Sequence, residues 1–514
     1  MRRRDFVTLL GALGAGFAQP RVFAATDDGE HASTATQALA RDLARIARLD
    51  RAGPHLNSIL ELNPDAHALA RALDAQARAG RRGALYGLTV VLKDNIATGD
   101  RMSVTAGSFA LEGVHAVRDA ALVARLRAAG ALITAKTNLS EWANLRSTRS
   151  TSGWSGRGGL TRNPYALDRT ASGSSSGSAV AVAAGLADLA VGTETDGSIV
   201  SPASINGCVG LKPTVGRVSR DGIIPLSHTQ DTAGPIARNV RDAARLMAVL
   251  AQASHDPNDP ATRNAPAPDD YLAGLKPDAL KGARIGVARN YFTGHDEVDA
   301  QIERAIAVLK QQGAVVIDPV DLPKVDYDDA ETTVLLYELK HDLPLWLASF
   351  APHARVRTLA DVIAFDEAHR AQEMPYFAQE LFQQSQATQG GLTAPAYLQA
   401  LARCGKRARD EGLAKTLHDH QLDAVIAPTG DVAWLNDLIK GDAPGNGFST
   451  PAAVAGYPHL TVPAGLVRGL PIGLSFVGAP WSEARLLALG YAFEQATHWR
   501  REPRYLAHTA IPSA

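Results

Sequence analysis

The stretch LYGLTVVLKDN, residues 85–95, indicates the fold class of this 514-residue chain. It is apolar as far as Leu92 and then changes abruptly to Lys93-Asp94-Asn95, which is typical of a buried strand that ends at a polar edge. The segments that follow predict a helix over 119–129 and a second strand over 131–135. Because strands and helices continue to alternate, the sequence predicts an α/β fold with parallel strands covered by helices.

The alternation extends in both directions from this strand. A helix is expected over 34–51, capped by Ser33 or Thr34, and another over 64–79, which ends before Gly80. Segments 144–178 and 255–275, rich in small and polar residues, are predicted to be loops. The other expected elements are strands over 189–191, 284–288, 314–317, 424–428 and 472–478, and helices over 179–186, 298–312 and, in a variable and mainly helical region, about 330–425.

Composition limits the possible partners. Hydrophobic residues make up 46% and charged residues 20% of the chain, and the formal net charge is −1, as expected of a soluble globular protein. No basic stripe indicates a nucleic-acid partner. No metal motif of the His-Glu-x-x-His or Cys-x-x-Cys type occurs, so neither a metal nor a cofactor is expected. His418 and His420 are predicted to be solvated. Cys208 and Cys404 are expected to remain separate buried thiols.

The N-terminus resembles an export signal. Arg3-Arg4-Asp5-Phe6 precedes the apolar run from Val7 to Ala18, which matches a twin-arginine pattern. The run is too short to span a bilayer, which takes about 20 residues. We expect residues 1–25 to be a signal peptide, residues 26–514 to be the mature domain, and the protein to be periplasmic or secreted. The alternatives are an amphipathic N-terminal helix and a retained anchor.

Two motifs rich in glycine and serine carry the chemistry: SGSSSGS at 172–178 and GTETDGS at 192–198. Such turns often serve only as tight connections or as anion cradles at a helix N-terminus. A phosphate loop would need a lysine directly after Gly177, and none follows. The first motif also matches Gly-x-Ser-x-Gly, with Ser175 as a nucleophile. That arrangement needs a hydrophobic strand immediately before it, whereas residues 163–171 are polar and contain a proline.

A different hypothesis uses both motifs together with Lys93. A serine needs a base to become nucleophilic, and neither motif contains a histidine. Burial at the end of an apolar strand favours the neutral form of a lysine, which could act as that base; the alternative is a lysine paired with a carboxylate. Ser198 follows a glycine turn whose N–H groups could stabilise an oxyanion, or it caps a helix. Ser174 would then bridge Ser198 and Lys93.

Several spaced segments together resemble the amidase signature family of serine hydrolases. The resemblance extends over essentially the whole mature chain. It rests on the two serine motifs and on GLTVVLKDN at 87–95, AKTN at 135–138, GLKPT at 210–214 and LPIGLSFVG at 470–478.

This resemblance implies one large α/β domain with a mixed central sheet flanked by helices. It implies a Ser–cis-Ser–Lys triad in which Ser198 is the nucleophile, Ser174 is the relay and Lys93 is the base. The relay serine of the family follows a cis peptide bond, which here would join Gly173 to Ser174. The implied oxyanion donors are the backbone N–H groups of Thr195, Asp196, Gly197 and Ser198.

Departures from the family pattern narrow the substrate. Ser172 and Ser176 replace glycines, and Val200 and Ser201 stand where many members carry a carboxylate-binding arginine, which disfavours substrates of the malonamate type. The segments ETDGSI at 194–199 and VSRDGIIP at 218–225 are similar to those of bacterial peptide amidases. The resemblance therefore implies hydrolysis of C-terminal carboxamides of peptides to an acid and ammonia.

Two alternatives stay open. The first is an aryl, fatty-acyl or other small-molecule amidase with the same triad, and the second is a binding protein that retains the fold without activity. The tRNA-linked amidotransferase subunit has the same triad but works with partner subunits, and the export signal argues against it. No obligate partner subunit is expected.

Overall fold

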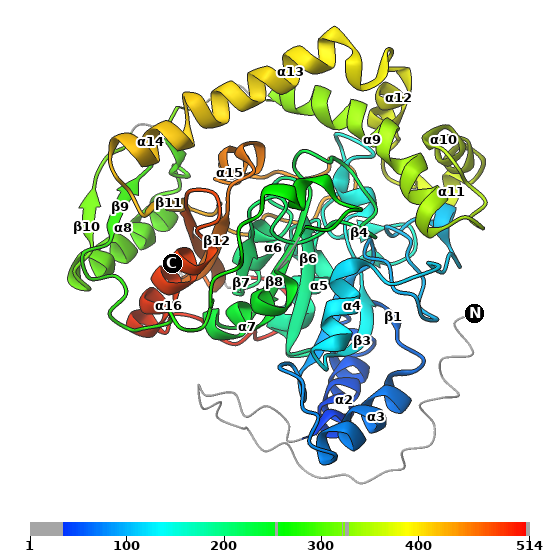
Figure 1. Ribbon diagram of the computed structural model, residues 1–514, viewed down its shortest axis with the longest axis horizontal. Helices are drawn as coiled ribbons and strands as arrows, with labels where there is room; N and C mark the ends of the chain where they lie inside the picture. Colours follow the sequence, from blue (N-terminus) through cyan, green and yellow to red (C-terminus); the bar gives the residue numbers. More distant parts are fainter. Residues whose placement is uncertain (1–33, 252–254, 321, 324–327, 510–514) are drawn as a thin grey trace.

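The computed structural model describes residues 34–251, 255–320, 322–323 and 328–509 (Figure 1). The predicted signal peptide at 1–25 lies outside these residues. Within them, none of the helices combines the length and the apolar character that a membrane crossing requires. Thr34 caps the first described helix, as predicted, because its hydroxyl accepts a hydrogen bond from the N–H of Gln37 over 3.2 Å.

The strands of the described residues form one mixed sheet of eleven and a separate two-stranded ribbon, β4 (Trp154–Ser155) with β5 (Gly159–Leu160). The order in the large sheet is β1-β3-β2-β6-β8-β7-β12-β13-β11-β9-β10. Its strands are β1 (Ile59–Leu62), β2 (Thr89–Lys93), β3 (Leu132–Thr137), β6 (Leu189–Glu194), β7 (Val209–Lys212), β8 (Thr232–Ala237), β9 (Arg284–Val287), β10 (Val315–Ile317), β11 (Ala424–Pro428), β12 (His459–Val467) and β13 (Leu470–Val477).

The expectation of parallel strands is correct for only part of this sheet. β2 runs parallel to β3 and β6, and β9 runs parallel to β10 and β11. Between them, β8, β7, β12 and β13 pair antiparallel. One reason is the two-residue loop between β12 and β13, where Arg468 and Gly469 both have positive φ, the conformation of a tight hairpin. The mixed sheet implied by the family resemblance is confirmed.

Helices cover this sheet, and short helical turns connect them. The α-helices are α2 (Ala35–Arg45), α3 (Ala66–Arg78), α4 (Ala121–Ala128), α5 (Ser176–Ala183), α6 (Val200–Ile205), α7 (Val240–Leu250), α8 (Asp296–Gln311), α9 (Asp328–Phe350), α10 (Leu359–Ala368), α11 (Arg370–Glu373), α12 (Glu380–Ala387), α13 (Pro395–Gly405), α14 (Leu413–Asp419), α15 (Thr450–Ala455) and α16 (Glu483–Thr497). The short turns are η1 (Ile46–Asp50), η2 (Phe109–Leu111), η3 (Glu141–Asn144), η4 (Pro260–Asn264), η5 (Arg289–Tyr291), η6 (Gly391–Thr393) and η7 (Lys406–Asp410).

The region about 330–425 is mainly helical, as predicted. Figure 1 shows α9 and α13 side by side along one edge of the molecule, in green and yellow, with α10, α11 and α12 at one end of the pair. This group of helices contacts the segment around residues 140–156, where Trp142 packs edge-on against Phe382 of α12. The helical region is therefore directly connected to the loop that precedes the first serine motif.

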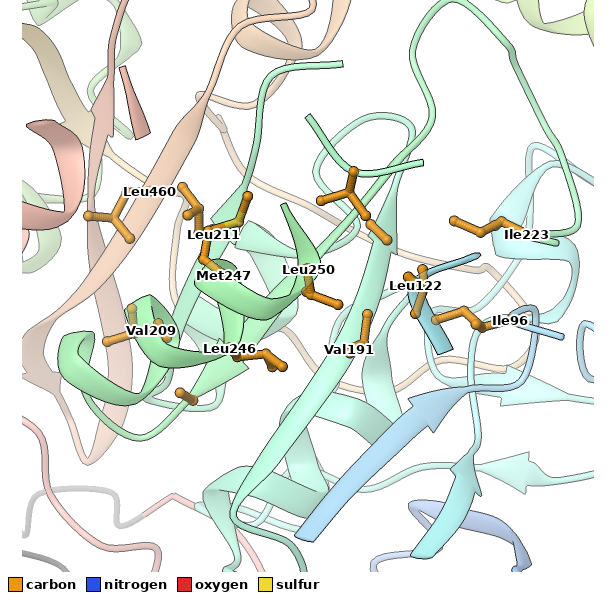
Figure 2. Close-up of a cluster of buried hydrophobic side chains, with 14 of the residues drawn as sticks. Ile96, Leu122, Val191, Val209, Leu211, Ile223, Leu246, Met247, Leu250 and Leu460 are labelled. Atoms are coloured by element: carbon orange, nitrogen blue, oxygen red, sulfur yellow. The ribbon is translucent and has the colours of Figure 1, made fainter. Parts of the chain in front are cut away.

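Among the described residues, the largest hydrophobic cluster lies between the sheet and several helices, which include α4 and α7. Figure 2 shows Leu246, Met247 and Leu250 of α7 facing side chains from the strands. Burying one such side chain stabilises a fold by roughly 1.5–3 kcal/mol. This core fixes β6 and β7, and with them the turn that carries the second serine motif. The buried partners labelled in the same view include Ile96, Leu122, Val191, Val209, Leu211, Ile223 and Leu460.

The first serine motif differs from its predicted structure in one respect. The helix expected over 179–186 begins three residues earlier, since α5 starts at Ser176 and includes Gly177. A Cβ at position 177 would lie 2.3 Å from the carbonyl oxygen of Ser58 and 2.5 Å from that of Asn138. Only glycine permits this close approach between α5 and the chain beyond β3, which tertiary packing decides and local periodicity does not show.

Candidate active site

Lys93 is the last residue of β2 and is fully buried. Its Nζ atom donates hydrogen bonds to Ser174 Oγ over 2.7 Å, to Thr193 Oγ1 over 2.9 Å and to the carbonyl oxygen of Thr193 over 3.2 Å. All three acceptors are uncharged. Burial lowers the pKa of Lys93 to about 7, although the negative charges of Asp231 and Glu194 act in the opposite direction. A substantial fraction of this lysine is therefore neutral near pH 7.

Ser174 lies in the segment that leads into α5, and its side chain is fully buried. The Gly173–Ser174 peptide bond is cis, as the family resemblance implies. The carbonyl oxygen of Ser174 accepts a hydrogen bond from the N–H of Ser140 over 3.1 Å. These contacts hold the Ser174 hydroxyl against the Lys93 amine.

Ser198 lies between β6 and α6 and retains 7% of its surface exposed. Its carbonyl oxygen accepts a hydrogen bond from the N–H of Ser175 over 3.1 Å, which brings the two serine motifs together. Gly197, with φ at +75°, turns the chain immediately before it. In the described part of the chain, the N–H groups of Gly197 and Ser198 donate to no protein acceptor. These two donors are available to a developing oxyanion.

Side chains on both sides hold this turn in place. Thr195 Oγ1 donates to Asp231 Oδ1 over 2.6 Å, and Thr450 Oγ1 donates to Asp196 Oδ2 over 2.6 Å. Glu194 Oε2 accepts hydrogen bonds from the first N–H groups after Ser198, those of Ile199 at 2.7 Å and Val200 at 3.0 Å. The turn between β6 and α6 is thus anchored at its beginning, its middle and its end.

Comparison with known proteins gives the family. A family model described as Amidase matches residues 43–487. The chain belongs to the amidase signature family. The native peptide amidase of Stenotrophomonas maltophilia is 51% identical, with a TM-score of 0.87, and the match covers 92% of this chain and 95% of that one. This amidase is a hydrolase that acts on carbon–nitrogen bonds of linear amides, as the sequence predicts.

Two further relatives show the breadth of the family. A probable amidase of Arabidopsis thaliana is 38% identical over 476 residues, which cover 90% of this chain and 87% of the relative. A glutamyl-tRNA(Gln) amidotransferase subunit of Roseiflexus castenholzii is 36% identical over 495 residues, which cover 91% and 92% of the two chains. Both simple amidases and one component of a larger enzyme are therefore similar to this amidase over most of their length.

Ser175 of this amidase occupies a different position from its neighbour Ser174. Its hydroxyl donates to the carbonyl oxygen of Thr193 over 3.1 Å and accepts from the N–H of the same residue over 3.2 Å. The side chain is fully buried, and no strand precedes it in the first serine motif. The geometry of a nucleophile elbow, which the pattern Gly-x-Ser-x-Gly could indicate, is absent from these described residues.

Sequence reasoning missed three residues of this amidase site. Thr193 contacts Lys93 through two oxygens, and Asn95 Nδ2 donates to Thr193 Oγ1 over 3.0 Å. Asp231 accepts a hydrogen bond from the hydroxyl of Thr195. Thr193 lies in the motif GTETDGS and Asn95 lies in the motif LKDN. Their positions in these motifs could have indicated that they lie near the site. Asp231 lies more than thirty residues beyond Ser198, and no local pattern connects it to the site.

Two departures from the family pattern contact each other. Ser172 Oγ and Ser201 Oγ are 2.8 Å apart and form a hydrogen bond. Ser172 has φ at +56° and is buried, whereas Ser201 is partly exposed in the first turn of α6. The two serine motifs of this amidase are therefore joined by a side-chain contact as well as by the Ser175–Ser198 backbone contact.

The remaining sequence predictions concern cysteines and metals. Cys208 and Cys404 are both free and buried, which confirms separate thiols. His418 is exposed and His420 is partly exposed. Over residues 34–509, apart from the few that the structure leaves undescribed, no group of three His, Cys, Asp or Glu side chains could hold a metal ion.

Proposed function

We propose that this amidase hydrolyses the C-terminal carboxamide of peptides to a carboxylic acid and ammonia through an acyl-Ser198 intermediate. The observation that carries the proposal is the 2.7 Å hydrogen bond between Lys93 Nζ and Ser174 Oγ, at a lysine whose hydrogen bonds all go to uncharged oxygens. In its neutral form this buried amine keeps two N–H donors, enough for the two oxygens of Thr193, and its lone pair can accept the proton of the Ser174 hydroxyl. The proposed roles are base for Lys93, relay for Ser174 and nucleophile for Ser198.

Acylation follows from these roles. Ser198 Oγ attacks the carbonyl carbon of the carboxamide, its proton passes to Ser174, and the Ser174 proton passes to Lys93. The carbonyl oxygen becomes an oxyanion that accepts hydrogen bonds from backbone N–H groups of residues 195–198, of which those of Gly197 and Ser198 are available. Lys93 then returns a proton through Ser174 to the amide nitrogen. The carbon–nitrogen bond breaks and ammonia leaves.

Deacylation reverses the proton path. Water attacks the acyl carbon while its proton passes through Ser174 to Lys93, and the Ser198–acyl bond breaks as the proton returns to Ser198 Oγ. The products are the free acid and the starting enzyme. Each step uses one base and one set of N–H donors, so no residue beyond this constellation has to supply or take up a proton.

The peptide carboxamide substrate is supported by similarity. The solved peptide amidase of Stenotrophomonas maltophilia is about half identical to this chain over more than nine-tenths of both. The pair Val200 and Ser201 places no cation directly after Ser198, which disfavours a substrate with a free carboxylate beside the amide. We also propose that the enzyme acts on its own, without partner subunits, and that it is exported through its twin-arginine-type N-terminus.

A panel of substrates tests this function. The protein is incubated with amidated peptides, the matching free-acid peptides, anilides and fatty amides, and the release of ammonia or amine is measured by mass spectrometry. We expect amidated peptides to lose ammonia while their internal peptide bonds stay intact. Turnover of anilides or fatty amides with none of amidated peptides would reject this substrate class in favour of an aryl or fatty-acyl amidase.

A further inference from the structure

Asp231 is a buried carboxylate on the same face of the sheet as the contacts of Lys93. In the antiparallel pair of β6 and β8, Thr193 lies opposite Ala233 and Glu194 lies opposite Thr232. The next pair along the same register is Thr195 opposite Asp231, just beyond the end of β8. Because alternate residues of a strand point to the same side, the side chains of Thr193 and Thr195 share one face.

The contacts on this face connect the two residues to the site. Thr193 Oγ1 accepts the hydrogen bond from Lys93 Nζ over 2.9 Å, and Thr195 Oγ1 donates to Asp231 Oδ1 over 2.6 Å. The lysine and the carboxylate therefore lie beside threonines that are two residues apart, which is roughly 7 Å along a strand. Asp231 is within electrostatic reach of Lys93 without a direct contact.

The other oxygen of Asp231 fixes the carboxylate in place. Asp231 Oδ2 accepts hydrogen bonds from the N–H of Leu226 over 2.8 Å and from the N–H of Ser227 over 2.9 Å. Three donors thus hold a side chain that is 7% exposed. Burial still raises the pKa of Asp231 to about 6, so the group is ionised where Lys93 becomes neutral.

The charges around this pair have other partners. Glu194 is the second carboxylate that faces Lys93, but it accepts from the N–H groups of Ile199 and Val200 and faces the buried Lys212. Arg220 is the cation that faces Asp231, and it forms an ion pair of 2.5 Å with Asp259. Among the described residues, Asp231 and Glu194 are therefore the carboxylates whose charges act on Lys93, and the charge of Asp231 has the larger effect on the pKa of that lysine.

We propose that Asp231 is a positioning residue of the amide hydrolysis, which holds the turn beside Ser198 through Thr195 and stabilises Lys93 while that lysine carries the proton from Ser174. The inference rests on the proposed role of Lys93 as the base. Above pH 7, resting Lys93 is mostly neutral while Asp231 is negative. When the proton moves from Ser198 through Ser174 to Lys93, the resulting ammonium faces a fixed carboxylate in a low-dielectric interior, where such a charge has its largest effect.

The test is the pH dependence of kcat/KM for an amidated peptide, measured from pH 5 to 10 in wild type and in Asp231→Asn. The asparagine removes the charge and keeps one acceptor oxygen, which can serve either the hydroxyl of Thr195 or the N–H groups of Leu226 and Ser227. We expect the acid limb of the profile to move down by about one pH unit, because Lys93 loses a nearby negative charge. We expect the plateau at high pH to fall about tenfold, because Lys93 becomes a weaker base. An acid limb that stays in place or moves up would overturn the proposal.

Two controls separate charge from structure. Thr195→Val removes the same hydrogen bond but leaves the carboxylate, so its rate should fall while its acid limb stays at the wild-type pH. Asp231→Glu restores the charge and should return the limb to the wild-type position. If Asp231→Asn does not fold, Asp231→Ala replaces it. We expect the acid limb of the pH profile to move down in that variant as well.

Lys93→Ala distinguishes this inference from the proposed function. Wild-type activity in Lys93→Ala would reject the proposed base and the inference with it. Loss of activity in Lys93→Ala, together with an unmoved acid limb in both charge-removing Asp231 variants, would reject only the role of Asp231. Loss of activity together with the downward shift supports both.

Discussion

The N–H of Ser175 donates a 3.1 Å hydrogen bond to the carbonyl oxygen of Ser198, and this contact joins the two serine motifs. The hydroxyl of Ser175 is directed elsewhere, to the backbone of Thr193 in β6. Neighbouring serines of one motif thus have separate contacts: Ser174 faces the Lys93 amine, while Ser175 supports the strand beneath it.

The first prediction follows from this separation. Ser175→Ala should retain activity within about tenfold of wild type, while the loss of two buried hydrogen bonds to Thr193 should lower the stability by about 1–3 kcal/mol. Ser174→Ala should lose at least ~10³-fold in kcat, because the proton path to Lys93 is interrupted. Ammonia release and thermal unfolding measure the two effects. The reverse result, with Ser175→Ala inactive and Ser174→Ala active, would support the elbow hypothesis instead.

The second prediction concerns the nucleophile. Ser198→Ala should abolish turnover by ~10⁴-fold or more, and no acyl adduct should appear on the intact protein by mass spectrometry after incubation with a slowly hydrolysed ester. Ser201→Ala is the matched control. Ser201 lies three residues after the proposed nucleophile, and its hydroxyl contacts that of Ser172. An adduct that persists in Ser198→Ala would place the acyl group on another residue.

The third prediction is the pH dependence of the wild-type enzyme. Burial lowers the pKa of Lys93 to about 7, and only the neutral amine accepts a proton. Activity is therefore present above pH 7 and is lost as the pH falls through that value, by about tenfold per pH unit at the acid extreme. Initial rates at low substrate concentration give the profile. An enzyme more active at pH 5 than at pH 8 would contradict a lysine base.

The fourth prediction concerns the turn before Ser198. Gly197 has φ at +75°, and a Cβ there would lie 3.0 Å from Ser449 Oγ. Gly197→Ala should therefore displace the N–H donors and lower kcat by ~10²-fold or more. Gly294→Ala is the control, because Gly294 has φ at +76° with open space around it. That variant should lose about 1 kcal/mol of stability and no activity. Equal kcat values for the two variants would show that the turn at Gly197 does not contribute N–H donors to catalysis.

A buried acidic cluster motivates the fifth prediction. The charges of Glu373 in α11 and Asp366 in α10 act on buried Glu141, and fully buried Arg146 forms an ion pair with Glu141 over 2.9 Å. Oxygens of Glu373 and Glu141 lie 2.8 and 2.9 Å from the position that a Cβ of Gly156 would take. Burial and the charge of Glu373 raise the pKa of Asp366 from 3.8 to about 8.

This shift has a definite sign for stability. The folded state favours the protonated form of Asp366. The contribution of this group to the free energy of unfolding is therefore fully present below pH 3.8 and is lost as the pH rises through about 8. Asp366→Asn should therefore unfold at a higher temperature than wild type at pH 9 and show a smaller decline between pH 5 and 9. Thermal unfolding at several pH values measures this. An identical pH dependence in the two proteins would exclude Asp366 as the titrating group.

Much of the fold could be predicted because the signals are local. The change from apolar residues to Lys93-Asp94-Asn95 predicted β2 and its polar end, and Thr34 and Gly80 were correctly placed at helix ends. The antiparallel centre of the sheet was not predicted, since strand order and direction depend on which cores form between distant segments. The early start of α5 was also missed, because Gly177 serves a close approach to residues far away in the chain.

The sequence by itself determined the family, the enzyme class and the three residues proposed as the triad, because short motifs specify backbone conformations and reactive side chains locally. Only the tertiary structure decided which serine touches Lys93, that Thr193 contacts this lysine, and that Asp231 accepts a hydrogen bond from Thr195 in the turn before Ser198. Those relationships depend on the register between β6 and β8 and on the burial of Lys93. Long-range packing fixes both, and it is the removal of water from Lys93 that lowers its pKa.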